Sequence, residues 1–218
     1  MGEVKPVRIG VLALQGAFAE HINLFNKLST PAQPIQCIDI RTSTQLADTT
    51  LDALVLPGGE STTMAIVAEK SGLLDGLKSW SHQDVKPVWG TCAGMILLSN
   101  TALATKESGQ PLIGGLDITI KRNAFGSQVD SFTADLDIGA LSPEFTTPFP
   151  GVFIRAPVVE SIVPAKGVDV LAKLDDGRIV AVRQGNIVAT AFHPELTRDD
   201  RLHRYFIELV KESLDGKK

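Results

Sequence analysis

Cysteine is scarce in this sequence, and its scarcity excludes two ways of stabilising a chain. The 218 residues include two cysteines, Cys37 and Cys92. Two thiols form no metal cluster, and a chain of this length needs no disulfide bond to fold. We therefore expect both thiols to be reduced and no metal to be bound.

An excess of basic charge and long apolar runs are also absent. The 21 lysine and arginine residues are outnumbered by 25 aspartate and glutamate residues, which gives a net charge of −4. Nucleic acids and anionic membranes favour strongly basic proteins, so we expect neither as a partner. No apolar run has the length of a membrane span, and the first residues lack the order of a secretory signal. These absences favour a cytoplasmic protein.

The residues that are present suffice for one sizeable core. Hydrophobic residues make up 44% of the chain and charged residues 21%. Glycine and proline are scattered as they are in turns, and no repeat or low-complexity tract marks a linker. We expect a single domain over residues 1–218.

The first half of the chain alternates short apolar segments with segments of helical length. Segments typical of parallel strands lie at residues 7–14, 35–40, 51–58 and 86–92. Residues 17–28 carry apolar side chains three and four positions apart, as an amphipathic helix does. Residues 62–80 and 94–103 also have helical character. This alternation predicts a parallel sheet with helices on both faces.

The second half is richer in strands. Segments of strand character lie at residues 116–125, 129–138, 151–163 and 168–194. Hairpin turns are indicated at residues 175–177 (DDG) and 184–186 (QGN), and residues 198–214 return to a helix. The predicted fold class is α/β: a doubly wound, mostly parallel sheet flanked by helices, with an added antiparallel strand region in the second half.

Cys92 stands in a turn made of small residues. The segment GTCAG, residues 90–94, follows the fourth predicted strand and precedes a predicted helix. This pattern is typical of a nucleophile elbow, in which glycines let the backbone turn sharply beneath the nucleophile. The dipole of the following helix favours a thiolate. The competing interpretation is a structural cysteine in tight packing, which is how we interpret Cys37 in the middle of its strand.

A thiolate nucleophile usually works with a histidine. Of the four histidines, we expect His21, His82 and His203 to be solvated side chains. His193 ends an apolar segment and is followed two positions later by Glu195. Both side chains leave the same strand end, so the carboxylate can hold the imidazole in the tautomer that accepts a proton from sulfur.

A second glycine-rich turn, LPGGEST at residues 56–62, follows the third predicted strand. Its two glycines free backbone N–H groups to point at an anion, as an oxyanion hole requires. Glu60 and Ser61 stand at the start of the following helix, where the simpler interpretation is that they cap it.

These motifs together resemble the class I (triad) glutamine amidotransferases, which combine GxCxG, a later HPE and an upstream PGG turn. More narrowly, the chain resembles the glutaminase subunits of pyridoxal 5′-phosphate synthases. The segments that carry this resemblance run in order from residue 10 to residue 206: GVLALQGAFAEH, LPGGESTTM, WGTCAGMILL, IKRNAFGSQVDSF, FIRAP and FHPELTRDDRLHRYF.

The resemblance implies an activity and a partner. The activity is hydrolysis of L-glutamine to L-glutamate and ammonia without a cofactor. The partner is the barrel-shaped synthase subunit, which would take up the ammonia within a hetero-oligomer to build the vitamin B6 ring. Carried onto this chain, Cys92 is the nucleophile, His193 its acid and base, and Glu195 the residue that orients the histidine.

The resemblance also implies the surroundings of the substrate. Backbone N–H groups of Gly59 and Ala93 would stabilise the oxyanion. An arginine suits the substrate carboxylate, and a glutamate suits its ammonium group. The residues implied to hold the amino-acid end of glutamine are Gly59, Glu60, Ser61, Arg122, Ile154 and Arg155.

Two further expectations concern the synthase. Gln15, at the exit of the first strand, faces the synthase by resemblance and is our candidate for sensing its docking. The chain departs from many relatives at Ser127, where they carry arginine, and residues 139–151 are richer in proline and aromatic residues than in short relatives. We interpret that segment as a partner-facing insertion.

Three other functions stay open. The glutaminase of another amidotransferase, such as imidazole glycerol phosphate synthase, would share the triad but not the LALQGAFAEH and RNAFG segments. A cysteine hydrolase or chaperone of the related doubly wound type would lack the HPE pair. A non-catalytic regulatory subunit is disfavoured by the intact Cys92, His193 and Glu195.

Overall fold

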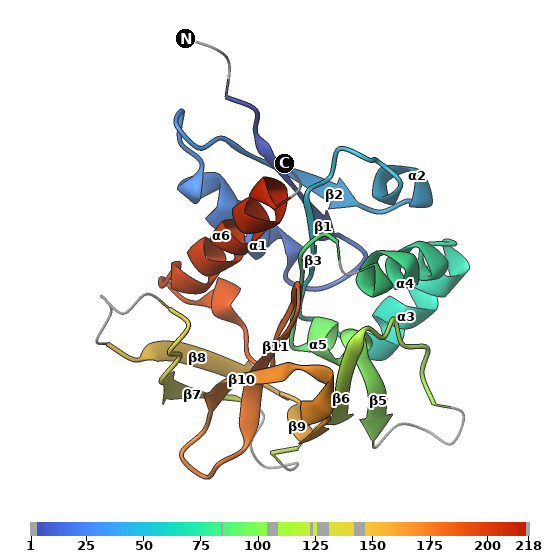
Figure 1. Ribbon diagram of the computed structural model, residues 1–218. Coiled ribbons are helices and arrows are strands. Elements are labelled where there is room, and N and C mark those ends of the chain that lie inside the picture. Colours follow the sequence, from blue (N-terminus) through green and yellow to red (C-terminus); the bar gives the residue numbers. More distant parts are fainter. Residues whose placement is uncertain are drawn as a thin grey trace.

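A ten-stranded mixed sheet runs through the molecule (Figure 1). Its order is β2-β1-β3-β4-β12-β11-β9-β6-β5, with β10 paired to β11. A separate antiparallel sheet joins β7 (Ser131–Leu136) to β8 (Phe149–Ile154). The strands of the large sheet are β1 (Val7–Leu12), β2 (Ile35–Ile40), β3 (Ala53–Leu56), β4 (Val88–Thr91), β5 (Ser99–Leu103), β6 (Leu116–Lys121), β9 (Val158–Ile162), β10 (Val168–Lys173), β11 (Ile179–Gln184) and β12 (Ile187–Thr190).

The structure is a computed structural model that describes residues 4–83, 85–103, 109–122, 124–125, 131–141 and 147–216. Ser127 and part of the 139–151 segment lie outside the described residues, so the expectations about them stay predictions. None of the helices in the described ranges combines the length and the apolar character that a bilayer span requires.

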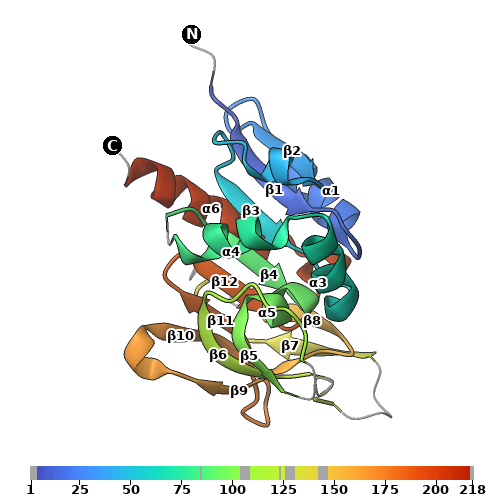
Figure 2. The ribbon, with the colours of Figure 1, turned by 90° about the vertical axis from the view of Figure 1, so that its right-hand side faces the viewer.

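Helices cover both faces of the large sheet. On one side α1 (Phe18–Leu28) and α6 (Arg201–Asp215) lie together (Figure 1). On the other side lie α3 (Ser61–Lys70), α4 (Leu74–His82) and α5 (Ala93–Leu98), which stand in front of the strands in Figure 2. The remaining short helices are α2 (Ser43–Leu46), η1 (Pro164–Lys166) and η2 (Pro194–Leu196).

The strand pairing confirms the predicted fold class. β2, β1, β3, β4 and β12 pair in parallel. Both predicted hairpins are present, because β11 pairs antiparallel with β10 and with β12. Every residue of β3, β4 and β12 is buried, which explains why these strands have continuous apolar sequences.

Two helix predictions need correction. The helical segment at residues 62–80 is divided by a turn at Gly72, whose φ is +70°. The predicted helix over residues 94–103 is wrong in its second half, since α5 ends at Leu98 and β5 begins at Ser99. The Ser99 hydroxyl donates to the Ile96 carbonyl at 2.7 Å and ends the helix, and the chain then pairs with β6. A strand partner distant in sequence overrides the local preference.

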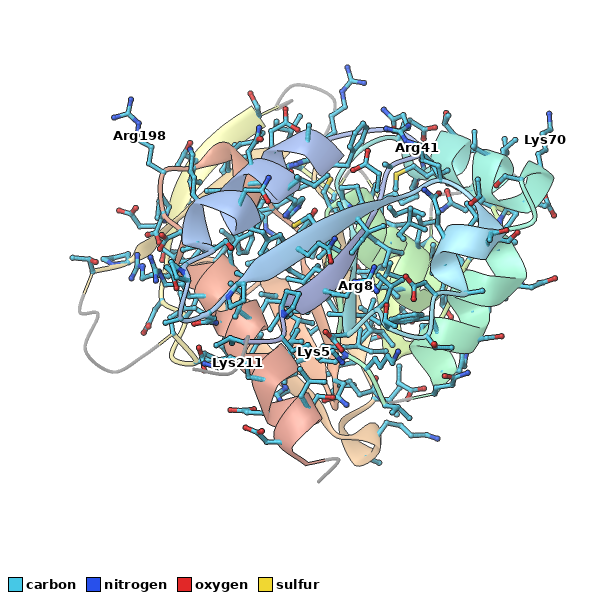
Figure 3. All side chains as sticks on the ribbon, turned by 90° about the horizontal axis from the view of Figure 1, so that it is seen from above. Lys5, Arg8, Arg41, Lys70, Arg198 and Lys211 are labelled. Carbon is cyan, nitrogen blue, oxygen red and sulfur yellow. The ribbon has the colours of Figure 1, made fainter. Side chains whose placement is uncertain are left out.

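The loops after the parallel strands gather at one edge of the sheet. Figure 3 shows Arg41 near the end of β2, between Lys70 and Arg198, which point outward on opposite sides of the molecule. The Arg41 guanidinium donates to the carbonyl of Ala13 at 2.8 Å, which joins the loop after β2 to the loop after β1. Ligand sites of open parallel sheets lie at this edge.

Candidate active site

Cys92 lies in a strained turn between β4 and α5. Its φ of 46° and ψ of −99° belong to a region that residues other than glycine rarely adopt. Its N–H donates to the carbonyl of Thr190 in β12 at 2.8 Å, which fixes the turn against the neighbouring strand. Ala93, directly after it, begins α5. This is the geometry of the predicted nucleophile elbow.

The glycines beside Cys92 are required by close packing. A Cβ atom on Gly94 would lie 2.0 Å from the carbonyl oxygen of Leu56 in β3. A Cβ atom on Gly90 would lie 2.6 Å from the carbonyl carbon of Gly94. Both contacts are with backbone that cannot move aside, so a larger residue at either position would push α5 away from the sheet.

His193 and Glu195 lie next to the thiol. Nδ1 of His193 is 2.7 Å from Oε1 of Glu195, whose side chain is fully buried. The N–H of His193 donates to the carbonyl of Val152 in β8 at 2.8 Å, which anchors the loop after β12. Burial alone lowers the pKa of His193, but hydrogen bonds and charges from Cys92 and Glu195 outweigh it and raise the pKa to about 10. The structure thus brings the three predicted triad residues together.

The loop after β3 lies against the same imidazole. A Cβ atom on Gly58 would lie 2.2 Å from Cε1 of His193, and one on Gly59 would lie 2.4 Å from Oε1 of Gln15. The N–H of Glu60 donates to that Gln15 oxygen at 2.7 Å. The loops after β1 and β3 therefore meet beside the imidazole, and Gln15 holds the peptide that follows Gly59.

Glu60 caps α3, as the simpler interpretation of the sequence expects. Its carboxylate oxygens accept from the backbone N–H groups of Thr62 and Thr63 at 3.1 and 2.7 Å. Slight burial raises the pKa of Glu60, but the hydrogen bonds from Thr63 and Thr62 outweigh it and leave the pKa below its ordinary value. Nη2 of Arg122 lies 3.5 Å from Glu60, so these two predicted substrate residues are also neighbours.

Gln110 is a site residue that the sequence motifs do not indicate. Its amide oxygen accepts from the hydroxyls of Ser61 and Thr62, both at 3.2 Å, and from Nη1 of Arg122 at 2.9 Å. Its amide nitrogen is buried without a hydrogen-bond partner among the described residues. A single glutamine in an irregular segment carries no local signal, and its place follows from the fold alone.

Ile154, the last residue of β8, and Arg155, directly after it, close another side of the site. The thiol of Cys92 lies 3.8 Å from the carbonyl oxygen of Ile154, so this contact is made by the main chain. Arg155 has a φ of 45°, and among the described non-glycine residues Cys92 and Arg155 have positive φ. Both strained residues thus belong to the same site.

The prediction of solvated side chains is wrong for His21 and His203, which are both completely buried, and right for the exposed His82. Nδ1 of His21 lies 3.0 Å from Nε2 of His203, and Nε2 of His21 lies 3.4 Å from Oε2 of Glu195. The sequence held a signal, because His21 stands four positions before Phe25 on the apolar face of α1.

The second cysteine lies elsewhere. Both thiols are free, and Cys37 packs half-buried against the core in β2. Burial, and then the charge of Asp39, raise its pKa to about 12, so it is not a thiolate at neutral pH. Within the described ranges, no group of three or more histidine, cysteine or carboxylate side chains is arranged to hold a metal ion.

Known protein families and sequences resemble this chain over nearly its full length. The SNO glutamine amidotransferase family matches residues 11–212. A pyridoxal 5′-phosphate synthase subunit PdxT from Dehalococcoides mccartyi is 48% identical over 206 residues, which cover 94% of this chain and 98% of the relative. A probable pyridoxal 5′-phosphate synthase subunit PDX2 from Arabidopsis thaliana is 45% identical over 233 residues, covering 95% of this chain and 88% of the relative.

Solved structures agree with these sequence matches. A crystal structure described as a glutamine amidotransferase superposes with a TM-score of 0.80 at 43% identity, covering 93% of this chain and 98% of the other. The structure of PurLQS from Thermotoga maritima matches with a TM-score of 0.59 at 17% identity, covering 99% of this chain and 100% of the other. That second likeness concerns the fold alone.

Proposed function

Because this chain belongs to the SNO glutamine amidotransferase family, we propose that it hydrolyses the side-chain amide of L-glutamine through a thioester on Cys92. We further propose that the released ammonia passes to the synthase subunit of a pyridoxal 5′-phosphate synthase. The observation that carries the proposal is the contact of His193 with both Cys92 and a fully buried Glu195 at the end of adjacent parallel strands.

The first half of the reaction forms the thioester. His193 accepts the proton of the Cys92 thiol, and the raised pKa of His193 favours the resulting imidazolium and thiolate pair. Sulfur attacks the amide carbon of glutamine, and the negative charge that develops on the amide oxygen is stabilised by the N–H groups of Gly59 and Ala93. The imidazolium then protonates the nitrogen, the C–N bond breaks, and ammonia leaves.

The second half releases the acid. Water loses a proton to His193 as its oxygen attacks the thioester carbon, and the C–S bond then breaks. The products are glutamate and the regenerated thiol, so one water is consumed for each ammonia released. Glu195 accepts a hydrogen bond from Nδ1–H of His193 throughout, which keeps Nε2 facing sulfur.

The substrate's amino-acid end is held beside α3 in this proposal. Arg122 pairs with the α-carboxylate and Glu60 with the α-ammonium group, while Ser61 and the main chain at Ile154 and Arg155 line the site. Arg122 and Ser61 both donate hydrogen bonds to Gln110. The substrate glutamine therefore has to share or replace those hydrogen bonds as it binds.

A glutaminase assay with separately supplied synthase subunits tests the proposal. Glutamate is measured with no addition, with a pyridoxal 5′-phosphate synthase subunit, and with an imidazole glycerol phosphate synthase subunit. We expect stimulation by the first synthase only, together with formation of pyridoxal 5′-phosphate. Stimulation by the second synthase only would reassign the partner, and no glutamate under any condition would favour a regulatory subunit.

The variant Cys92→Ala and its matched control Cys37→Ala assign the nucleophile. Cys92→Ala should fold and lose glutamine hydrolysis completely. Cys37→Ala should retain turnover and lose only the small stability expected of a half-buried side chain. Residual hydrolysis above a few per cent of the parent in Cys92→Ala would contradict the thioester.

A further inference from the structure

A line of buried polar side chains continues behind Glu195, away from the thiol. Oε1 of Glu195 binds His193, whereas Oε2 is buried and has no hydrogen-bond partner among the described residues. Nε2 of His21 lies 3.4 Å from this second oxygen, and it forms a 3.3 Å hydrogen bond with the hydroxyl of Thr91. Nδ1 of His21 in turn lies 3.0 Å from Nε2 of His203.

Both imidazoles are held neutral. Burial, followed by the charges of His203 and His193, places the pKa of His21 well below its ordinary value. Burial likewise lowers the pKa of His203 to about 3, against a smaller opposing effect of Asp200. Each ring therefore carries one N–H at neutral pH, and its other nitrogen is an acceptor.

The carboxylate fixes which nitrogen carries the proton. An ionised carboxylate only accepts hydrogen bonds, so we assign the proton of His21 to Nε2, where Oε2 of Glu195 and the hydroxyl oxygen of Thr91 are its two acceptors. Nδ1 of His21 is then an acceptor, and His203 donates to it through Nε2–H. The nitrogen left over is Nδ1 of His203, which is buried, has no hydrogen-bond partner in the part of the chain that the structure describes, and in this arrangement is an acceptor. In the opposite arrangement the lone pair of His21 Nε2 would face the carboxylate, and Nδ1–H of His203 would be buried without an acceptor. Proteins rarely tolerate such an unpaired N–H.

We propose that His21 and His203 are positioning residues of the glutaminase triad, with His203 donating to His21 and His21 donating to Oε2 of Glu195. This proposal rests on the proposed function. The physical reason is that a buried carboxylate bound through one oxygen only can rotate away from His193. A second donor on its other oxygen prevents this rotation. We expect the 3.4 Å contact to shorten when substrate binds, as catalytic hydrogen bonds often do.

The competing interpretation is that both histidines are only core aromatics. His203 packs edge-on against Trp89 at 4.9 Å and against Phe25 at 5.0 Å, and His21 packs edge-on against Trp89 at 5.4 Å. A phenylalanine keeps these ring contacts and removes the N–H, whereas a glutamine keeps an N–H donor and removes the ring. The two substitutions therefore separate the two interpretations.

The first test compares His21→Phe with His21→Gln in the presence of the synthase. We expect His21→Phe to lower kcat about 10- to 100-fold, the range of a lost hydrogen bond to a charged group, with KM unchanged. His21→Gln should recover most of the loss, since its amide can reach Glu195. The matched control is His82→Gln on the exposed end of α4, which should behave as the parent. If glutamine were no better than phenylalanine, the donor role of His21 would be wrong.

The second test asks whether both histidines act through Glu195. In a Glu195→Gln background, His21→Phe and His203→Phe should cause no further loss of kcat, because the carboxylate that they position is gone. In the otherwise unchanged enzyme, His203→Phe should lower kcat less than His21→Phe does. The double variant should have the same kcat as His21→Phe alone. Losses that simply multiply in the combined variants would overturn the proposal. If His21→Phe fails to fold, His203→Phe alone carries this comparison.

A readout without substrate keeps the two proposals apart. The rate at which iodoacetamide alkylates Cys92 reports the thiolate that His193 and Glu195 maintain. We expect His21→Phe and His203→Phe to slow this alkylation, while His82→Gln leaves it unchanged. An unchanged rate in both phenylalanine variants would refute the positioning role even if the parent hydrolyses glutamine. If the phenylalanine variants are alkylated more slowly than the parent but the parent hydrolyses no glutamine, only the proposed function is refuted.

Discussion

At the scale of single residues, the charge on His193 depends on its two neighbours. Cys92 and Glu195 raise its pKa to about 10 against the effect of burial, so removing either neighbour changes the proton that the reaction moves. Because Glu195 is buried and within hydrogen-bond distance of Nδ1, its role is set by geometry as well as by charge.

His193→Asn and Glu195→Gln should therefore fail in different ways. His193→Asn removes the group that accepts and returns the proton, and kcat should fall by roughly 10⁴-fold or more. Glu195→Gln keeps the side-chain shape but neither stabilises the imidazolium nor selects the tautomer, so kcat should also fall steeply while KM holds. Steady-state kinetics with the synthase present measure both, and a Glu195→Gln variant with the parent's kcat would contradict the orienting role.

Stability above neutral pH should depend on His193. Its folded-state pKa of about 10 lies above the ordinary 6.5, so the folded protein binds this proton more tightly than the unfolded chain does. The stabilisation is complete below pH 6.5 and is lost as pH rises through about 10. The difference in unfolding free energy between the parent and His193→Asn, measured by urea titration, should shrink over this window. A difference that stays constant would argue against the raised pKa.

Stability below neutral pH should depend on His203 with the opposite sign. Its folded-state pKa of about 3 lies below 6.5, so the unfolded chain binds a proton that the folded protein cannot. This stabilisation is complete above pH 6.5 and is lost as pH falls through about 3. As pH falls from 6.5 to about 3, the unfolding free energy of His203→Phe should decrease less than that of the parent. The His82→Gln variant should decrease as the parent does. Equal acid sensitivity of His203→Phe and the parent would contradict the prediction.

At the scale of elements, the site depends on how closely α5 packs against β3. Gly94→Ala would place a Cβ atom 2.0 Å from the carbonyl oxygen of Leu56, so α5 must shift and carry Cys92 away from His193. We expect a loss of stability greater than the roughly 1 kcal/mol of an average substitution, together with a loss of glutamine hydrolysis.

Gly139→Ala is the matched control for this packing, because a Cβ atom on Gly139 would meet no atom of the described residues within 4 Å. Thermal unfolding followed by circular dichroism compares the two variants. Gly139→Ala should unfold at nearly the temperature of the parent. An equally stable and active Gly94→Ala variant would show that α5 is free to move.

At the scale of the whole molecule, the proposed function requires that glutamine hydrolysis be coupled to the enzyme that uses ammonia. Ammonia released into water is protonated to unreactive ammonium, so hydrolysis without a synthase wastes glutamine. Glycines on both sides of the peptide after Gly58 lower the steric cost of turning its N–H toward or away from the oxyanion, but turning breaks the 3.0 Å hydrogen bond from the N–H of Ala17 to the Gly58 carbonyl. One oxyanion donor contributes about 10²- to 10³-fold in kcat. Gln15 accepts a hydrogen bond from the N–H of Glu60, directly after this pair of glycines. A movement of Gln15 on docking would therefore shift the peptide after Gly59 and, through it, the glycine pair.

The isolated chain should therefore be a poor glutaminase that the synthase activates. Glutamate production is measured against added synthase for the parent and for Gln15→Ala, and we expect the variant to be activated less. Full activity of the isolated parent, with no stimulation, would refute the coupling. An unimpaired Gln15→Ala variant would remove only Gln15 from it.

Local patterns in the sequence suffice to predict the parallel half of the sheet and to select Cys92, His193 and Glu195, which the structure brings together. Continuous apolar strands, small residues around Cys92 and the closely spaced His193 and Glu195 are local patterns, because each follows from neighbours within a few positions. The helix cap formed by Glu60 also follows from such neighbours, whereas the carbonyl of Leu56 that excludes a side chain at Gly94 comes from another strand.

What lies behind the triad and beside the proposed substrate residues depends on the packing of segments that are far apart in the sequence. β5 replaces the second half of a predicted helix because β6 supplies a strand partner from elsewhere in the chain. His21 and His203 are 182 positions apart, and they meet only because α1 and α6 pack on the same face of the sheet. Gln110 reaches Arg122 through an irregular segment that has no periodicity. Contacts of this kind depend on the energy of the whole packed arrangement, so no local pattern of residues encodes them.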